Sequence, residues 1–237
     1  MRLIILSGGA AQGLVKALAP QFKAESGCEI EGTFGAVGAM RDKLLAGAPA
    51  DLLILTRRLI DELVGQGHAV PASAIDIGTV VTAVAVRTGD SAPAVGDPEA
   101  LRAALVAADE IYIPDPKLAT AGIHIARALE TLGITEQVAP RLRTFPNGAT
   151  AMRALALARS ARPIGCTQAT EIVATPGVTL VAPLPEPIDL ATIYTAAVSM
   201  RAALPDEACA LASLLTGDAA SAARRQAGFD QAPPLPA

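Results

Sequence analysis

The sequence predicts an α/β protein built from two Rossmann-like lobes joined by a two-strand hinge. Three observations support this prediction. Short apolar runs alternate with segments of helical apolar spacing, a pattern typical of strand–helix units around a parallel sheet. Turns containing glycine follow several of these runs. Two long runs rich in β-branched residues, 77–87 and 191–200, have the length expected of strands that connect two sheets.

The first strand–turn–helix unit shows what chemistry such a fold offers. An apolar run over 2–6 stops at Ser7-Gly8-Gly9, and helical spacing follows from Leu14 to Phe22. The first turn of a helix has backbone N–H groups without partners and is partly positive. Glycine lacks a Cβ atom and lets a ligand come close to the backbone. This turn is therefore predicted to form one wall of an anion site, and not only a geometric turn.

Two further units follow the same plan. A strand over 28–33 leads into a glycine-containing turn over 34–39 and a helix, and a buried strand over 51–55 leads into a helix capped by Thr56. In a parallel sheet the three loops lie at one edge, where ligands of such folds bind. Arg57 follows directly and could clamp a carboxylate through two hydrogen bonds.

The middle of the chain is predicted to form an inserted lobe. Its elements are a helix over 99–108, strands at 110–113, 142–145, 164–167 and 178–181, and helices that start near 123 and 148. The predicted lobes are 1–78 with 196–237, and 79–195. Helices over 205–215 and 219–227 close the chain, and the tail from Gln231 is expected to be loose. A hinged pair of lobes is expected to close around a ligand held between them.

Composition excludes several classes of partner. The 237 residues are 51% hydrophobic and only 3% aromatic, and the net charge is −4, so we expect no nucleic acid and no attraction to an anionic membrane. No apolar run reaches the ~18 residues of a membrane span, so we expect no membrane insertion. The sequence starts at Met1 without a leader, which predicts a cytoplasmic protein, or a periplasmic one if a leader has been removed. A monomer is expected.

Cysteine and histidine give little sign of a reactive centre. Cys28, Cys166 and Cys209 are widely spaced and form no CxxC pair, so we expect neither a disulfide framework nor a zinc site, and no metal or cofactor. Cys28 and Cys209 are predicted to be small buried residues. Cys166, near a strand end, could be a nucleophile, but a buried packing role is favoured because no histidine is close to it in sequence. His124 is a candidate acid or base near a helix start, although packing is the alternative interpretation. The catalytic residues are otherwise unknown.

The order of motifs resembles the periplasmic-binding-protein superfamily of type 2 topology, and within it the molybdate-binding family of ABC-transporter solute-binding proteins. The likeness rests on the unit over 3–22, on 33–36 leading into 44–52, on Asp115-Pro116 with 121–123, and on 163–165 and 227–229. The run from Ala46 to Leu52 is its most specific element, and it supports the fold without being a ligand contact.

The resemblance implies an oxyanion held by serine hydroxyls and backbone N–H groups, but this chain departs from that pattern. The two serine positions fall on Ala10 and Val37, and a late tyrosine contact falls on Gln168. Each lost hydrogen bond to a charged ligand costs on the order of 1.5–3 kcal/mol. We therefore expect an anion other than molybdate, with Ser7 and Thr150 as nearby hydroxyls.

Three functions stay open. The first is a solute-binding protein for a small oxyanion or carboxylate, with an ABC-transporter permease as partner if it is exported. The second is an isomerase of a small unsaturated carboxylic acid, since some relatives of this fold resemble aconitate isomerase. The third is a sensor module for a cytoplasmic ligand. The predicted ligand-binding residues are Ser7, Gly8, Gly9, Ala10, Ala36, Val37, Gly38, Arg57, Ala121, Gly122, Asn147, Gly148, Thr150 and Gln168.

Overall fold

The computed structural model describes residues 1–230 and divides into two compact units. Unit 1 comprises Met1–Val80 and Thr192–Asp230, and unit 2 comprises Val81–Ala191. Both the predicted lobe boundaries and these observed ones fall within the strands β4 (Ile75–Arg87) and β9 (Ala191–Val198). The predicted loose tail from Gln231 lies outside the described residues. The α/β class is confirmed.

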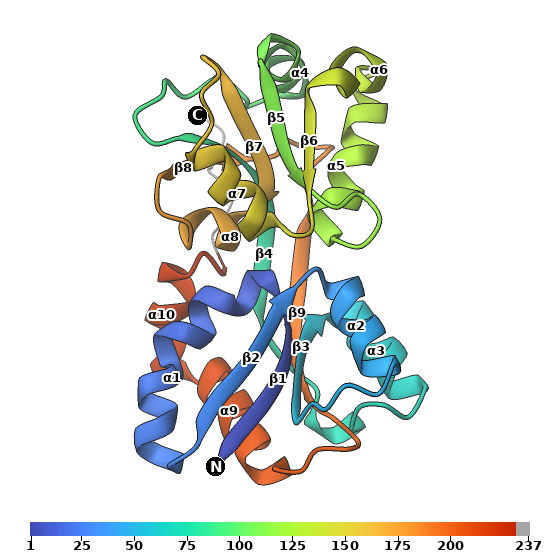
Figure 1. Ribbon diagram of the computed structural model, residues 1–237, viewed down its shortest axis with the longest axis vertical. Coiled ribbons are helices and arrows are strands. Elements are labelled where there is room, and N and C mark those ends of the chain that lie inside the picture. Colours follow the sequence, from blue (N-terminus) through green and yellow to red (C-terminus); the bar gives the residue numbers. More distant parts are fainter. Residues whose placement is uncertain (231–237) are drawn as a thin grey trace. The chain divides into compact units, whose positions relative to one another are not determined.

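Unit 1 is built on a sheet in the order β2-β1-β3-β9-β4. Strands β1 (Arg2–Gly8), β2 (Glu29–Gly35) and β3 (Leu52–Thr56) run parallel, and β9 is antiparallel to β3. Figure 1 shows β1, β2 and β3 side by side. The helices are α1 (Gln12–Ser26), α2 (Val37–Leu45), α3 (Arg57–Gly65), α9 (Pro205–Thr216) and α10 (Ser221–Gln226), with 3₁₀ turns η1 (Gly9–Ala11), η2 (Pro71–Ser73) and η4 (Asp218–Ala220).

The core of unit 1 explains these elements. Strand β3 is buried at every position, as expected of a strand in the middle of a sheet. Helix α1 presents Leu14, Leu18 and Phe22 at helical spacing to the same core, where Phe229 near the described end of the chain is also buried. Residues distant in sequence therefore complete one apolar core.

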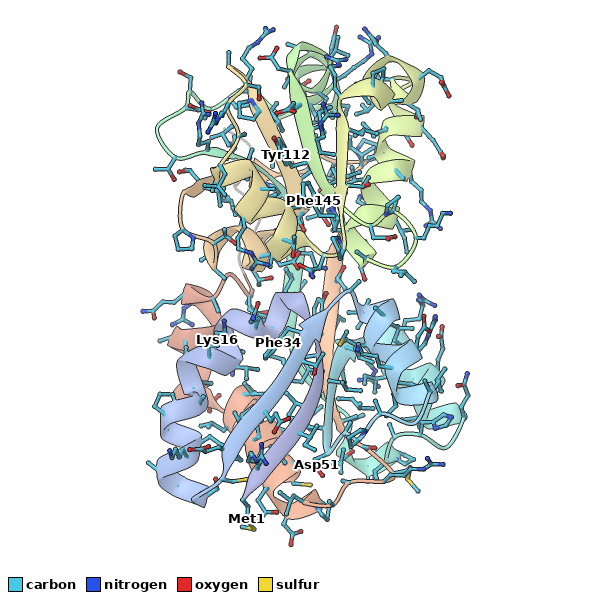
Figure 2. The ribbon with its side chains drawn as sticks, in the orientation of Figure 1. Met1, Lys16, Phe34, Asp51, Tyr112 and Phe145 are labelled. Carbon is cyan, nitrogen blue, oxygen red and sulfur yellow. The ribbon has the colours of Figure 1, made fainter. Side chains whose placement is uncertain are left out.

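Asp51 joins three segments of unit 1. Its side chain, in a residue only 3% exposed, precedes β3, and Figure 2 labels it at that end of the strand. Its Oδ2 accepts a hydrogen bond from Ile4 N at 2.8 Å, and its Oδ1 accepts from Ala203 N and Leu204 N at 2.7 and 3.0 Å. The run over 46–52 therefore has a structural role, through the hydrogen bonds of Asp51, as the family resemblance implied.

Unit 2 has a mixed sheet in the order β4-β7-β5-β6, with β8 also on β4. Strands β5 (Glu110–Pro114), β6 (Leu142–Phe145) and β7 (Pro163–Gln168) are parallel, and β4 is antiparallel to both β7 and β8 (Val178–Pro183). The helices are α4 (Pro98–Ala107), α5 (Thr120–Thr131), α6 (Thr135–Val138), α7 (Gly148–Ala156) and α8 (Ala169–Val173), with the 3₁₀ turn η3 (Ala139–Arg141).

Helices cover both faces of this sheet. Successive residues of a strand point to opposite faces, and in β5 Ile111 and Ile113 belong to one apolar cluster while Tyr112 belongs to the other. The first cluster includes Leu129 of α5, and the second includes Met152 of α7. Figure 2 shows Tyr112 beside Phe145, and their rings stack with centroids 5.9 Å apart.

The structure corrects part of the sequence prediction. The long strands β4 and β9 run antiparallel to their neighbours, so the sheets are mixed and not wholly parallel. Cys28 and Cys166 are buried as predicted, but Cys209 is exposed, so that prediction was wrong. Among the described residues, no helix is both long and apolar enough to cross a membrane.

Candidate functional site

The carboxyl ends of the parallel strands in unit 1 form the first candidate edge. Gly8 at the end of β1 is the register partner of Gly35 at the end of β2. A Cβ atom on Gly8 would lie 2.7 Å from Val37 Cγ1 and 2.8 Å from Tyr194 Cε1. Glycine is therefore required here by packing, which brings the start of α2 close to the end of β1.

Two helical segments begin at this edge without a capping side chain from the N-cap residue and without an acid in the first turn. The N-cap residues Gly8, before η1, and Ala36, before α2, place no side chain on the first turn, and neither first turn contains an acid. Helix α3 differs, because Thr56 Oγ1 accepts a hydrogen bond from Leu59 N at 3.5 Å. The starts of η1 and α2 thus keep the positive end of the helix dipole without a side-chain acceptor.

At this edge of unit 1, Ser7 carries the one hydroxyl among the predicted site residues, and it is used within the chain. Ser7 is fully buried, and its Oγ donates to Gly8 O at 2.9 Å. Ala10, Ala36 and Val37 are buried at the starts of η1 and α2. Gly9 and Gly38 belong to the same two first turns. Any anion at this edge would therefore meet N–H donors.

Arg57 is engaged by two acids of unit 1. Its Nε donates to Asp61 Oδ1 at 3.0 Å, and its Nη1 donates to Asp76 Oδ1 at 3.2 Å. Hydrogen bonding to Asp76 is the main cause that raises the pKa of Arg57. Asp76 also accepts from Thr195 Oγ1 at 2.7 Å. A two-bond carboxylate clamp by Arg57 would have to break these pairs.

The second candidate edge is formed by the ends of the parallel strands in unit 2. Helix α5 begins after β5, and its N-cap Ala119 provides no side-chain cap; its first turn holds no acid. Ala121 and Gly122 are buried there. A Cβ atom on Gly122 would lie 2.2 Å from Asp115 O, so glycine lets the helix start pack on this loop. Asp115 Oδ1 accepts hydrogen bonds from Lys117 N and Leu118 N, so this side chain fixes the turn after β5.

Helix α7 at the same edge is capped from within. Asn147 Oδ1 accepts hydrogen bonds from Thr150 N at 2.9 Å and from Thr150 Oγ1 at 3.0 Å. Arg153 Nη2 donates to the same Thr150 hydroxyl at 2.9 Å. Asn147 and Thr150, both predicted ligand residues, are therefore partnered inside unit 2.

Glu171 is a buried acid that the sequence did not single out. It lies in α8, is only 7% exposed, and its Oε2 accepts from Thr167 Oγ1 at 2.6 Å. Burial raises the pKa of its carboxyl, while hydrogen bonds from Thr167 and from the backbone of Ala149, Gly148 and Gln168 oppose that rise. The five-residue helix α8 was not predicted, so no local pattern signalled that this acid faces α7.

His124 and Gln168 are also placed by unit 2. His124 Nε2 lies 2.9 Å from the carbonyl oxygen of Ile188, so Nε2 is the donor and Nδ1 remains the acceptor of a neutral ring. Gln168 is buried at the end of β7. Cys166, on the same strand, has its pKa raised to about 12 by burial, which makes it a poor nucleophile. His124 stays a candidate base.

Taken one unit at a time, both edges offer backbone N–H donors on buried small residues. In the part of the chain that the structure describes, no three histidine, cysteine or acidic residues gather as metal ligands would. The chemistry that these edges support is reversible binding of a small anion. A family model described as bacterial extracellular solute-binding protein matches residues 3–230.

The chain belongs to the bacterial extracellular solute-binding protein family. Its predicted resemblance to the molybdate-binding group is confirmed by the molybdate-binding protein ModA of Escherichia coli (strain K12), which is 27% identical over 83% of this chain and 77% of its own length. An aconitate isomerase from Pseudomonas sp is 26% identical, over 99% of this chain and 89% of its own.

Two solved structures of binding proteins share the fold of this chain. The periplasmic molybdate-binding protein of Azotobacter vinelandii has a TM-score of 0.78 at 19% identity, covering 97% of this chain and 99% of its own. The sulfate-binding protein SubI from Mycobacterium tuberculosis H37Rv has a TM-score of 0.77 at 20% identity, covering 99% of this chain and 88% of its own. The predicted periplasmic-binding-protein fold is therefore confirmed.

Proposed function

We propose that this solute-binding protein binds a small carboxylate through backbone N–H groups. The observation that carries the proposal is the set of three helix starts, η1, α2 and α5, that follow parallel strands. Each lacks a capping side chain and an acid in its first turn. Such starts attract anions through the helix dipole and unpaired N–H donors.

A carboxylate fits these edges better than a tetrahedral oxyanion such as molybdate. The serine positions implied by the family resemblance are Ala10 and Val37, which carry no hydroxyl. The nearby hydroxyls are already used, since Ser7 donates to Gly8 O and Thr150 donates to Asn147 Oδ1. Hydrogen bonds to a charged ligand contribute about 1.5–3 kcal/mol each, so their absence disfavours an anion with four oxygens to satisfy.

A thermal-shift screen tests this proposal. Acetate, succinate, citrate and aconitate are compared with molybdate, tungstate, sulfate and phosphate, because a ligand that binds only the native state raises the melting temperature. The proposal predicts a dose-dependent rise with at least one carboxylate and a smaller rise with the tetrahedral oxyanions. If none of the anions shifts the transition, the protein is not an anion binder.

Closure of two lobes around the ligand stays a prediction from the sequence. Small-angle scattering with and without a ligand from the screen tests it, since closure would lower the radius of gyration. An ABC-transporter permease is the proposed partner of an exported form, and a form retained in the cytoplasm would bind its ligand there. Cell fractionation separates these two forms.

An isomerase acting on an unsaturated carboxylic acid is the second candidate function. It is favoured by the aconitate isomerase relative, which aligns with 99% of this chain. His124 would serve as the base through Nδ1, because Nε2 is held by Ile188 O. Conversion of aconitate, followed by ultraviolet absorbance and product analysis, tests this. Full turnover by His124→Ala would remove His124 from the mechanism, and no turnover by the wild type would remove the enzyme hypothesis.

A further inference from the structure

The carboxyl group of Glu171 fills the start of α7 in unit 2. Its Oε2 accepts from Thr167 Oγ1 at 2.6 Å. The backbone of Gly148 and Ala149, in the first turn of that helix, and of Gln168 lies near enough to favour the ionised carboxyl and so to lower its pKa against the effect of burial. The helix start that sequence analysis assigned to a ligand is therefore used by a carboxyl group of the chain itself.

Gly148 is what admits this carboxyl group. A Cβ atom at position 148 would lie 1.9 Å from Glu171 Oε2 and 2.0 Å from Thr167 Oγ1. Even alanine would thus collide with both partners. The cradle has the shape of one planar carboxyl group bounded by a hydroxyl donor and amide donors, and it lies at the candidate edge of unit 2.

No cation balances Glu171 within its described surroundings. The elements that pack most extensively against α8 are α7, β7 and β8. Their charged or titratable side chains are Arg153 on α7, which donates to Thr150 Oγ1, and Cys166 on β7, which is buried. A buried carboxyl without a cation holds its proton to higher pH than an exposed one. Hydrogen bonds alone stabilise its ionised form here.

We propose that Glu171 determines which anions the protein accepts, by holding the donors of α7 and placing an acidic group beside any ligand at this edge. This inference rests on the proposed function. A second negative charge near a buried carboxyl is unfavourable unless the carboxyl takes up a proton. The protein therefore accepts singly charged carboxylates more readily than doubly charged oxyanions, and binds a dianion together with a proton.

Calorimetry on the wild-type protein tests the inference without a mutation. Sulfate keeps its charge from about pH 6 to pH 8, so any proton exchanged on binding belongs to the protein. Titrations in two buffers of different ionisation enthalpy give the number of protons taken up. We expect net proton uptake when sulfate binds, and less when acetate binds. The association constant for sulfate should fall by up to about tenfold for each unit by which the pH rises.

Glu171→Gln is the matching variant, since an amide keeps the shape and an acceptor for the backbone donors. We expect it to bind sulfate more tightly than the wild type, with no proton uptake and no pH slope. Glu130→Gln removes the same charge from an exposed position of the same unit, and should leave sulfate binding and its pH slope unchanged. A merely structural role of Glu171 would change stability but not the pH slope.

The outcomes separate this inference from the proposed function. Sulfate binding without proton uptake in the wild type, or an unchanged pH slope in Glu171→Gln, overturns the inference and leaves anion binding intact. If Glu171→Gln binds sulfate and the wild type does not, the inference is supported. If no anion binds either protein at any pH, both the proposed function and the inference are wrong.

Discussion

The two units treat the helix starts at their strand ends differently. In unit 1, η1 and α2 begin with Gly8 and Ala36, and no side chain of the described residues caps them. In unit 2, α7 receives the amide oxygen of Asn147 and the carboxyl of Glu171. Helix α5 of unit 2 resembles the uncapped starts of unit 1.

A glycine at a helix start therefore has two physical uses. Gly8 is the last residue of β1, directly before η1, and Gly148 is the first residue of α7. Gly8 makes room for Val37 and Tyr194, whereas Gly148 makes room for the carboxyl of Glu171. Of the two helix starts, only the one after Gly8 has no side-chain cap. Four substitutions and a pH titration test this contrast, and they are ordered by decreasing expected effect.

Asp51→Ala should have the largest effect on stability. Asp51 is the buried acid of unit 1, but it lies before β3 and holds three backbone N–H groups. Leaving these donors unsatisfied should lower the free energy of unfolding by about 3–5 kcal/mol. Urea denaturation measures this. The exposed Asp61→Ala control should lose far less, and equal losses would mean that Asp51 is not a structural anchor.

Gly148→Ala should come next. The new Cβ would meet Glu171 Oε2 and Thr167 Oγ1, and such overpacking costs about 1–3 kcal/mol. Gly65→Ala is the matched control, because nothing lies within 4 Å of its added Cβ and a glycine in a helix is less stable than alanine by about 0.5–1 kcal/mol. Equal stability of both variants in urea would contradict the cradle around Glu171.

Ala36→Asp should give α2 a capping side chain at its N-terminus, where Ala36 provides none. An N-cap aspartate stabilises a helix by about 0.5–2 kcal/mol relative to alanine, and its charge would occupy the donors meant for the ligand. Carboxylate affinity should fall by at least tenfold, or about 1.4 kcal/mol, in calorimetry. Ala46→Asp puts the same charge at the exposed other end of α2 and should keep its affinity.

The stability of the protein should depend on pH through Glu171. Its folded pKa lies above the unfolded one because of burial, so the folded state binds more protons. Stability is then fully present below the unfolded pKa and declines as pH rises through the folded pKa, by about 1.4 kcal/mol for each pH unit that separates the two pKa values. Urea titrations should show a flatter decline for Glu171→Gln. Parallel curves for the two proteins would contradict this assignment.

Arg57→Ala should have the smallest effect on binding. Because the guanidinium of Arg57 is paired with Asp61 and Asp76 at an exposed position, its removal should change carboxylate affinity by less than about twofold. Titration by calorimetry measures this. A loss of tenfold or more would instead make Arg57 the carboxylate clamp that its sequence position suggested.

Much of the fold could be predicted because local patterns agreed with it. Periodicity located the central strands and most helices, and the run over 142–145 matches β6 at both ends. The five-residue α8 was not predicted, because so short a helix has almost no periodicity. The exposure of Cys209 was also missed, since one cysteine does not reveal which face of α9 it occupies.

For the candidate site, only the backbone features, the uncapped helix starts, could be predicted from the sequence; the side-chain partners could not. Glycine and alanine at the strand ends indicated open helix starts, and η1, α2 and α5 have that form. The partners that satisfy donors come from distant segments. Glu171 lies 23 residues after Gly148 by their numbering, and no local rule connects them. Asp76 beside Arg57 is a second example.

Whether uncapped helix starts hold the anion is decided by a carboxylate titration of the wild type and of Ala36→Asp in the calorimeter, using the best carboxylate from the thermal-shift screen. Binding at these starts predicts saturable one-site binding to the wild type and affinity at least about tenfold weaker for Ala36→Asp, while the Ala46→Asp control matches the wild type. Unchanged affinity in Ala36→Asp, in a variant with a normal melting transition, would contradict the claim that uncapped helix starts hold the anion.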